Sequence, residues 1–509
     1  MKSELYRLSL RLFVALSLLV VASCSDDDDW QEPDVPEQED LHPRFVTESN
    51  GSLVNYENFD YDFADSTVIE MRSTVMGAQG KVTEYTINAV VLGGMVTMPN
   101  DESDNGAIPL KLNNPATPKG VTVVNKGHIT VHTKDLLEKY KAVCRGDDET
   151  KRYYSLRVLV MYAGENSSVI NDGTIDVYFD HDPDSRIMVY CMALNAGSNS
   201  QIINNGTINF HGNGSVKTRF RGMATFGNSI SAINYGTMTS ELQMCDDARF
   251  ITTGGDFCNV VNAGTMVGRQ PGKFLAMTRY GNSNLANDGH ISLTTIDWPQ
   301  GYTTVNGSED EFACAMYEPL NNQRSEMPAL INRGTIEMKV ETSDNSSPNL
   351  QSYGMMADLM SNYGVRFDLN FVNDGSIVVS QTGPVKCRMG EAGFIARQAA
   401  VNSKAGLQMR IGRWKTQLRD FAKTQDLFFS TGVKADLGNF NLKLTSADNY
   451  VPGTVYSVAP TDLIYDATHG AGRYDIKSAN SMQVTLAANE ENYVLDWNQE
   501  AQTVALNKK

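Results

Sequence analysis

Five basic residues recur at a nearly constant distance before a repeated asparagine, and side chains of this type could bind an acidic ligand. Each lies 13 to 15 positions before its asparagine. In a stack of similar units this spacing would align them along one face, where guanidinium groups match the geometry of carboxylate or sulfate. The alternative is that they are exposed strand ends that keep a sheet soluble. The candidate ligand-binding stripe consists of Arg157, Arg219, Arg221, Arg249 and Lys273.

The repeated asparagine belongs to a phrase that occurs eight times between Val123 and Ile377. Each copy has two apolar residues, Asn, any residue, Gly, a small polar or His residue, and a final Ile or Met. The apolar residues can face a core, Gly accepts a positive φ at a sharp turn, and Asn can hydrogen-bond turn backbone. The phrase therefore predicts a strand, a turn and a second strand. The asparagines are Asn125, Asn171, Asn204, Asn234, Asn262, Asn287, Asn332 and Asn373.

The spacing of these asparagines favours a stacked β-coil. Consecutive asparagines lie 25 to 46 residues apart, which is too irregular for helical hairpins of fixed length but is natural for coils with variable loops. A second glycine, such as Gly227 or Gly255, precedes most of them by six or seven positions and follows an apolar segment that supplies a further strand. We predict an all-β fold, a single-stranded parallel β-helix with N- and C-terminal capping elements. The eight asparagines would form a structural turn ladder, and the Ile and Met column would fill the interior.

These phrases resemble the repeats of right-handed parallel β-helix families, both the pectin-lyase-like enzymes and the repeat adhesins. The resemblance covers about half of the chain and is specific for the fold, not for an activity. Enzymes of this type cluster carboxylates, sometimes with Ca²⁺, or use Arg, Lys or His as a base on the outer face of neighbouring coils. In this chain the candidate acids do not recur at matching offsets in adjacent coils. They are Asp182, Asp184, Asp246, Asp247 and Asp256.

We therefore assign no catalytic residues, and the chain is more consistent with a non-enzyme than with an enzyme. Ca²⁺ is expected only if it is an enzyme, and no other cofactor is indicated. Aromatic residues near the basic stripe could stack on sugar rings or simply fill turns; they are Phe220, Phe226, Phe250 and Tyr280.

Histidines do not indicate a metal site. His128 and His290 occupy the slot that holds Thr in other copies of the repeat, so they are expected to be ordinary coil residues. His132 lies four residues after His128 and shares its face in a regular strand, but no third ligand is visible. No nucleophile elbow, zinc-protease motif or phosphate-binding glycine loop is present in the sequence. Nucleotide and protease chemistry are disfavoured, and we expect no metal and no nucleic-acid partner.

The N-terminus resembles a lipoprotein signal peptide over residues 1–23. Three basic residues precede an apolar run from Leu12 to Val21, and the run ends in Val21-Ala22-Ser23-Cys24. The run is shorter than the ~20 residues that a membrane span requires. Cys24 is therefore predicted to be lipidated after cleavage, which would attach the protein to a membrane through its acyl chains.

Residues 24–45 are predicted to be the lipidated cysteine and an acidic, disordered tether. The segment from Asp26 to Asp40 holds nine acids and no Lys or Arg, which prevents it from burying a core. The start, Ser25-Asp26-Asp27-Asp28-Asp29, is similar to the export signal of surface lipoproteins in Bacteroidota-type bacteria. We expect the protein to be anchored in the outer membrane and to face the cell exterior. The net charge of −17 becomes −10 for residues 41–509 once the signal peptide and these acids are set aside.

The repeat region, residues 121–380, is flanked by less regular sequence. Residues 46–120 have strand-like phrases without the full repeat and suit an N-terminal cap or degenerate first coils. Residues 381–425 include a basic block in which Leu407 to Ala422 could be a short helix. Residues 426–509 return to alternating strands, as terminal coils or a β-cap. Six cysteines follow Cys24 without a C-x-x-C motif, and buried free thiols are favoured slightly over disulfides.

Two functional hypotheses follow from these observations. The first is a non-catalytic, adhesin-like or glycan-binding surface lipoprotein, whose ligand is a glycan or a host or cell-surface molecule. It depends on the anchor, the uniform coils and the missing carboxylate cluster. The second is a surface polysaccharide lyase or glycoside hydrolase of the β-helix type, which depends on fold analogy alone. The first is favoured, and the oligomeric state is left open.

Overall fold

A computed structural model describes most of the repeat region and parts of both flanks. The described residues are 45–47, 52–55, 58–60, 68–76, 82–92, 120, 122–134, 153–181, 186–194, 200–281, 283–299, 312–320, 329–346, 350–359, 367–385, 387–396, 407–416, 426–431, 439–444, 455–457, 481–486, 493–498 and 503–508. The predicted signal peptide, Cys24, and nearly all of the predicted tether lie outside them. The described strands belong to the unit of residues 42–509.

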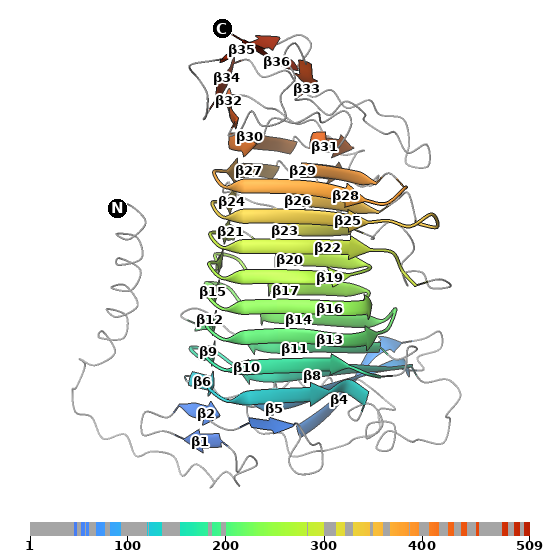
Figure 1. Ribbon diagram of the computed structural model, residues 1–509. Coiled ribbons are helices and arrows are strands. Elements are labelled where there is room, and N and C mark those ends of the chain that lie inside the picture. The colour runs from blue at the N-terminus through green and yellow to red at the C-terminus, as the bar shows by residue number, and fades with distance from the viewer. Residues whose placement is uncertain are drawn as a thin grey trace, which may run out of the picture. The chain divides into compact units, whose positions relative to one another are not determined.

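The chain passes through three sheets in turn, which we name A, B and C, and each pass is one coil (Figure 1). For example, β9 (Ser168–Asn171) lies in sheet A, β10 (Thr174–Phe179) in sheet B and β11 (Arg186–Leu194) in sheet C. The next coil repeats this order and pairs in parallel with the one before it. This cycling confirms the predicted all-β parallel β-helix.

The remaining strands extend the same three sheets. Sheet A also contains β1 (Phe45–Thr47), β2 (Leu53–Asn55), β6 (Thr122–Asn125), β12 (Ser200–Asn204), β15 (Ile230–Asn234), β18 (Asn259–Asn262), β21 (Asn284–Asn287), β24 (Ala329–Asn332), β27 (Phe367–Asn373), β30 (Leu407–Thr416), β32 (Asn439–Leu444) and β34 (Ser481–Leu486). Sheet B also contains β3 (Asn58–Asp60), β7 (His128–His132), β13 (Thr207–Gly214), β16 (Thr237–Met244), β19 (Thr265–Gln270), β22 (His290–Ile296), β25 (Thr335–Glu341) and β28 (Ser376–Thr382). Sheet C also contains β4 (Val68–Met76), β5 (Val82–Leu92), β8 (Tyr153–Ala163), β14 (Thr218–Thr225), β17 (Asp247–Thr253), β20 (Lys273–Arg279), β23 (Phe312–Leu320), β26 (Gln351–Leu359), β29 (Arg388–Ala396) and β31 (Asp426–Thr431).

The turn between sheets A and B is the most regular part of the coil. In all eight repeats the sheet A strand ends at the asparagine and the sheet B strand begins three residues later. Each of these asparagines is fully buried, and each of the first seven donates from Nδ2 to Oδ1 of the asparagine in the next coil at 2.8 Å. Asn55 adds a ninth member below Asn125, also at 2.8 Å. Asn55 does not match the repeated phrase, because Glu57 stands where the repeat has glycine.

The repeat glycines are needed for a reason that differs from the prediction. Among the described residues, positive φ angles occur at other positions and not at these glycines. A Cβ atom at Gly206 or Gly236 would instead overlap the carbonyl oxygen of the repeat glycine one coil below. The turn backbone of each coil also donates to the coil below, for example from Gly206 N to Asn171 O at 2.9 Å. The expectation of a positive φ at these glycines was therefore wrong. Glycine is needed there because the close stacking of the turns leaves no room for a Cβ atom.

The interior is a continuous apolar column. The final Ile or Met of every repeat is buried within one core cluster, together with Val and Phe residues of sheet B and alternate residues of sheet C. Rings from sheets B and C meet in this interior, where Phe179, Phe210, Phe220, Phe250 and Phe274 contact one another in sequence although they are not register partners. Phe220 and Phe250 therefore pack in the core and are not available to stack on sugars.

The flanks continue the coil and add antiparallel strands. In the N-terminal flank β1 pairs antiparallel with β2, and β4 pairs antiparallel with β5. In the C-terminal flank β33 (Val455–Ser457), β35 (Tyr493–Asn498) and β36 (Thr503–Lys508) form an antiparallel sheet.

The helix predicted from Leu407 to Ala422 was wrong over its described part. Residues Leu407–Thr416 form β30, which pairs in parallel with β27. The apolar residues Leu407, Met409 and Ile411 alternate with period two, and the sheet A edge of the previous coil offers a ready pairing partner. Residues 417–422 lie outside the described part of the chain.

Two further observations concern the described residues. The five cysteines among them are free, and Cys191, Cys245, Cys258 and Cys314 are buried.

In the same part of the chain, no helix has the length and hydropathy needed to cross a lipid bilayer.

Candidate functional site

Four of the five predicted basic residues lie together on the outer face of sheet C. Residues alternate along β14, so that Phe220 enters the core while Arg219 and Arg221 face outwards. In the next coils Asp247 pairs in register with Arg219 and Lys273, and Arg249 with Arg221. We name this group the sheet C charge cluster; it consists of Arg219, Arg221, Asp246, Asp247, Arg249 and Lys273.

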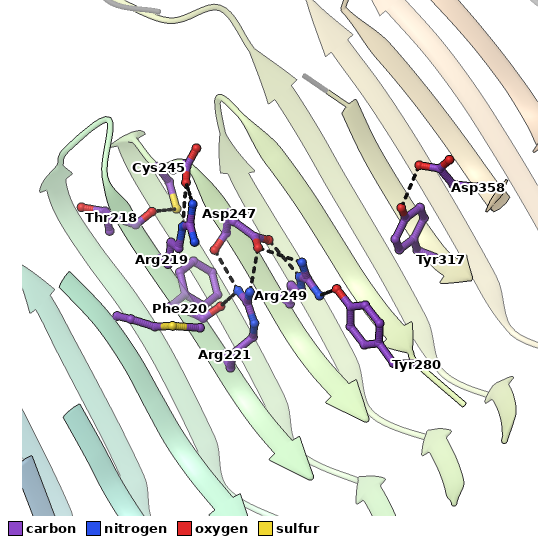
Figure 2. Close-up of polar contacts among 12 residues, drawn as sticks. Thr218, Arg219, Phe220, Arg221, Cys245, Asp247, Arg249, Tyr280, Tyr317 and Asp358 are labelled. Atoms are coloured by element: carbon purple, nitrogen blue, oxygen red, sulfur yellow. Dashed lines mark hydrogen bonds and ion pairs between the residues drawn. The ribbon is translucent and has the colours of Figure 1, made fainter. Parts of the chain in front are cut away.

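Asp247 holds two arginines at the centre of this cluster (Figure 2). Arg249, two residues later on the same strand, donates from Nε to Oδ1 at 2.9 Å and from Nη2 to Oδ2 at 2.8 Å. Arg221, from the preceding coil, donates from Nη2 to Oδ2 at 2.7 Å and from Nη1 to the backbone oxygen of Asp247 at 2.9 Å. A single carboxylate therefore fixes two guanidinium groups from neighbouring coils.

Arg219 and Asp246 form a second pair at the edge of the cluster. The Nε atom of Arg219 donates to Oδ2 of Asp246 at 2.7 Å. The Arg219 side chain is 32 % exposed, whereas those of Arg221 and Arg249 are 7 % exposed. The cluster therefore has a buried centre, held by Asp247, and a more accessible edge.

Aromatic side chains of the following coils continue the cluster. Tyr280 accepts a hydrogen bond from Nη1 of Arg249, and its ring centroid lies 5.4 Å from the guanidinium carbon. The Nζ atom of Lys273 lies 5.0 Å from the ring centroid of Phe312 and 5.3 Å from that of Tyr317. Tyr317 in turn donates to Asp358 at 3.0 Å. These rings limit the positions of both cations through cation–π contacts.

The ion pairs fix the charge states at the centre of the cluster. Burial raises the pKa of Asp247, but the charges of Arg221 and Arg249 outweigh it and hold this pKa far below its usual range. Burial lowers the pKa of Arg249, but the Asp247 carboxylate outweighs it and raises this pKa above its ordinary value. Burial and the charge of Arg249 lower the pKa of Arg221. Asp247 and Arg249 therefore remain ionised near neutral pH.

Arg157, the fifth predicted residue, lies two coils away from Arg219. It belongs to β8 and is in register with Met188 of β11, which is in register with Arg219. Its backbone therefore lies in the same column as the cluster, and its side chain lies outside the described part.

The other candidate residues lie elsewhere. Asp256 lies in an exposed turn, and Asp182 and Asp184 lie outside the described residues. His128 and His132 lie on the outer face of sheet B, where each bonds a carboxylate of the next coil. Within the described part of the chain, no group of three His, Cys, Asp or Glu side chains could hold a metal ion.

Sequence reasoning missed how these residues combine. It treated Asp246 and Asp247 separately from the basic stripe, although Asp247 and Arg249 are two apart and share a strand face. It also missed Tyr317 and Asp358, for which no local signal exists. Their contact depends on the register of β23 and β26, which the variable loops conceal.

Comparison with known proteins supports the fold of this chain. Residues 45–237 match the family model described as the BigA third pectate lyase-like domain. No curated protein and no solved structure gives a significant match. The match ends at β16, so it includes Arg219 and Arg221 but not Asp247, Arg249 or Lys273. The parallel β-helix of this chain is thus similar, over residues 45–237, to a pectate lyase-like domain.

Proposed function

We propose that this protein is a non-catalytic, adhesin-like surface lipoprotein whose sheet C charge cluster binds an acidic glycan. The observation that carries this proposal is the charge balance of the cluster. Four basic side chains lie beside two carboxylates on one sheet face, so the cluster is cationic although the whole chain is acidic. A carboxylated or sulfated sugar would complement this excess of positive charge.

The fixed charge states favour binding over cleavage. A general acid or base works best when its pKa lies near the working pH. The pKa values of Asp247 and Arg249 are displaced away from neutrality in opposite directions. Their hydrogen bonds are also committed to each other, which suits a rigid binding surface better than a proton-transfer site.

The accessible edge of the cluster would contact the ligand. Arg219 is partly exposed, and Lys273 and Tyr280 are half-buried. The buried Arg221 and Arg249 would act by holding Asp247 and Tyr280 in place and by adding positive potential. A ligand carboxylate at this edge would compete for Arg219 with Asp246, whose side chain is buried.

The cellular localisation in this proposal is inferred from the sequence. Cys24, in its lipobox-like context, would carry the acyl chains, and the acidic tether would hold the coil away from an outer membrane. Cys24→Ser should abolish lipid labelling and release the protein from the membrane fraction. Protease treatment of intact cells should degrade the anchored wild type if it faces outwards. An unchanged membrane association of Cys24→Ser would contradict the anchor.

The binding proposal is tested by removing the two accessible cations. We expect Arg219→Ala/Lys273→Ala to weaken binding of polygalacturonate or heparin by about tenfold or more, measured by calorimetry on unlipidated protein. The matched control, Arg333→Ala/Lys339→Ala, removes two cations whose side chains are 43 % exposed elsewhere on the coils. Equal losses of affinity in both double variants would show that only the net charge matters and would contradict the site. Unchanged binding by Arg219→Ala/Lys273→Ala would also contradict it.

One observation favours the alternative, a polysaccharide lyase. The pKa of Arg221 is lowered by burial and by Arg249, which is the direction that an arginine base requires. Incubation with acidic polysaccharides, with and without Ca²⁺, should therefore be followed for unsaturated or reducing ends. Release that disappears in Arg221→Lys would place the chain among the enzymes and contradict the non-catalytic proposal.

A further inference from the structure

A second group of polar rings lies on the outer face of sheet B, away from the charge cluster of sheet C. His132, Tyr178 and His211 occupy the same register position on β7, β10 and β13. Their rings stack, with centroids 4.9 Å apart for His132 and Tyr178 and 5.0 Å apart for Tyr178 and His211. We name these three residues the sheet B ring row. Because stacked rings cover each other's faces, the row presents its polar edges to solvent.

Carboxylates fix the orientation of the imidazoles. His132 bonds Asp180 through Nδ1 at 2.9 Å, and His211 bonds Asp176 through Nε2 at 3.3 Å. His128, on the same sheet face, bonds the other oxygen of Asp176 through Nε2 at 2.5 Å. The three imidazole side chains are 38 to 40 % exposed.

These contacts determine which ring nitrogen is available. Burial raises the pKa values of Asp176 and Asp180, but hydrogen bonds outweigh it and lower both, so these groups are ionised near neutral pH. An ionised carboxylate only accepts hydrogen bonds, so the bonded ring nitrogen must be the donor. In a neutral imidazole the other nitrogen is then an acceptor, namely Nε2 of His132 and Nδ1 of His128 and His211.

The neighbouring polar groups complete a hydrogen-bonding surface. Asn209 donates from Nδ2 to Asp176 at 2.7 Å, and Thr239 donates to Asn209 at 2.6 Å. Glu241, an exposed residue, is in register with His211 on the next strand. With neutral imidazoles the surface is negative, which disfavours an acidic ligand, and its outward acceptors and the Tyr178 hydroxyl suit a ligand rich in hydroxyl groups.

We propose that the sheet B ring row binds a neutral, hydroxyl-rich oligosaccharide that lies across β7, β10 and β13. Successive polar ring edges, one from each coil, would bond hydroxyl groups of successive sugars. Asp176 acts as a positioning residue, since it is buried and holds His128 and His211, whereas Asp180 holds His132 and is as exposed as that imidazole. This site is on a different sheet from the acidic-glycan site, and either can fail without the other.

The test is calorimetric titration of the unlipidated protein with cellohexaose, xylohexaose and mannohexaose at about pH 7.5. At least one of these neutral probes should bind wild type, and His211→Ala and Tyr178→Phe should each weaken it by about fivefold or more. The control is His290→Ala, because His290 occupies the register column of His128 but lies on β22, three strands beyond β13 in sheet B. Tyr178→Phe removes only a hydroxyl group and keeps the ring stack, so it guards against misfolding of the histidine variant.

A structural role for the row would give a different pattern. In the proposed site, Asp176→Asn should change the ¹⁵N tautomer signature of His128 and His211 and weaken binding, whereas His290→Ala should leave binding unchanged. Absence of binding by all three neutral probes would overturn the proposal. It would also be overturned if the variants bound as wild type does, or if only oligogalacturonate bound.

Discussion

The turn between sheets A and B and the outer face of sheet C are built by the same stacking, yet they have opposite residue patterns. In the turn, one residue type repeats in nine coils, and each asparagine bonds an identical neighbour at 2.8 Å. On sheet C, the column of Arg219 continues with Asp247 and Lys273, so that the charge alternates between neighbouring coils, and the adjacent column places Arg221 in register with Arg249. Both positions place side chains of neighbouring coils in contact.

This difference separates a structural position from a candidate site. Identical residues in a column satisfy one another and leave nothing for a ligand, as the fully buried asparagines show. A column of different charged residues forms a local pattern that exists only at those coils. In a solenoid, we therefore expect function where the stacked residues differ and stability where they agree.

The largest expected effect comes from breaking the centre of the charge cluster. Asp247→Ala would leave Arg221 and Arg249 buried without their shared carboxylate, which should lower the free energy of unfolding by about 3–5 kcal/mol. Urea unfolding followed by circular dichroism measures this loss. Asp172→Ala, which removes an exposed carboxylate in a turn, is the control and should have little effect. A small loss for Asp247→Ala would mean that the cluster is not a buried network.

The same carboxylate predicts how stability depends on pH. The folded-state pKa of Asp247 is held far below its unfolded value of about 3.9. Its contribution is therefore fully present above about pH 5 and is lost as the pH falls towards the folded-state pKa, because the unfolded chain then binds more protons. Unfolding midpoints of wild type should fall between about pH 5 and pH 3, and those of Asp247→Asn should fall less. Parallel profiles for the two proteins would contradict this assignment.

On the structural side of the comparison, the glycine column is the most sensitive position. The Cβ atom of Gly236→Ala would overlap the carbonyl oxygen of Gly206, and backbone can yield only if the coils separate. We expect a loss of about 1–3 kcal/mol in thermal or urea unfolding. In Gly254→Ala the nearest atom, Thr225 O, is 3.1 Å from the new Cβ, so the loss should be smaller. A reversed order would show that stacking does not select the repeat glycines.

The asparagine ladder should show a similar or somewhat smaller effect. Asn234→Ala removes the acceptor of Asn204 and the donor to Asn262, both of which are buried. Leaving such groups unsatisfied costs about 1–3 kcal/mol. Asn205→Ala, one residue beyond the ladder and exposed, removes only a hydrogen bond to Asp172 and is the matched control. Equal stabilities of the two variants would argue against a stabilising ladder.

The smallest expected effect is at an exposed ion pair. Arg333 donates from Nε to Asp288 at 2.6 Å, with side-chain exposures of 43 % and 32 %. Solvent screens such a pair, so Arg333→Ala should change the unfolding free energy by about 0.5 kcal/mol or less. Measured beside Asp247→Ala, this variant tests whether burial accounts for the difference between the two ion pairs.

Much of the coil could be predicted because its signals are local. The phrase from Val169 to Ile175 contains a strand, its turn and the start of the next strand, and it recurs with little change. Prediction failed where the signal was altered or misleading. Asn55 lacks the glycine that identifies the turn, and the helical spacing of Trp414, Leu418 and Phe421 predicted a helix where Leu407–Thr416 pairs with β27 as a strand.

The candidate site could be predicted only as a set of residues. The spacing before the asparagines identified Arg219, Arg221, Arg249 and Lys273, and the structure places all four on one face. It did not show that Asp247 would bond two of them. The number of residues between neighbouring positions changes from coil to coil, so the partner of a given side chain cannot be counted along the chain.

By itself the sequence determined the kind of coil, because a short apolar–Asn–Gly phrase encodes its turn through contacts within a few residues and between identical neighbours. Only the tertiary structure decided which unlike residues meet. Arg221 and Asp247 are 26 positions apart and lie on adjacent strands, whereas Tyr317 and Asp358 are 41 apart and also lie on adjacent strands. The physical reason is that backbone pairing sets the register between coils, whereas loops of any length can join them. Stacking therefore determines which side chains of the outer face become neighbours and how deeply they are buried.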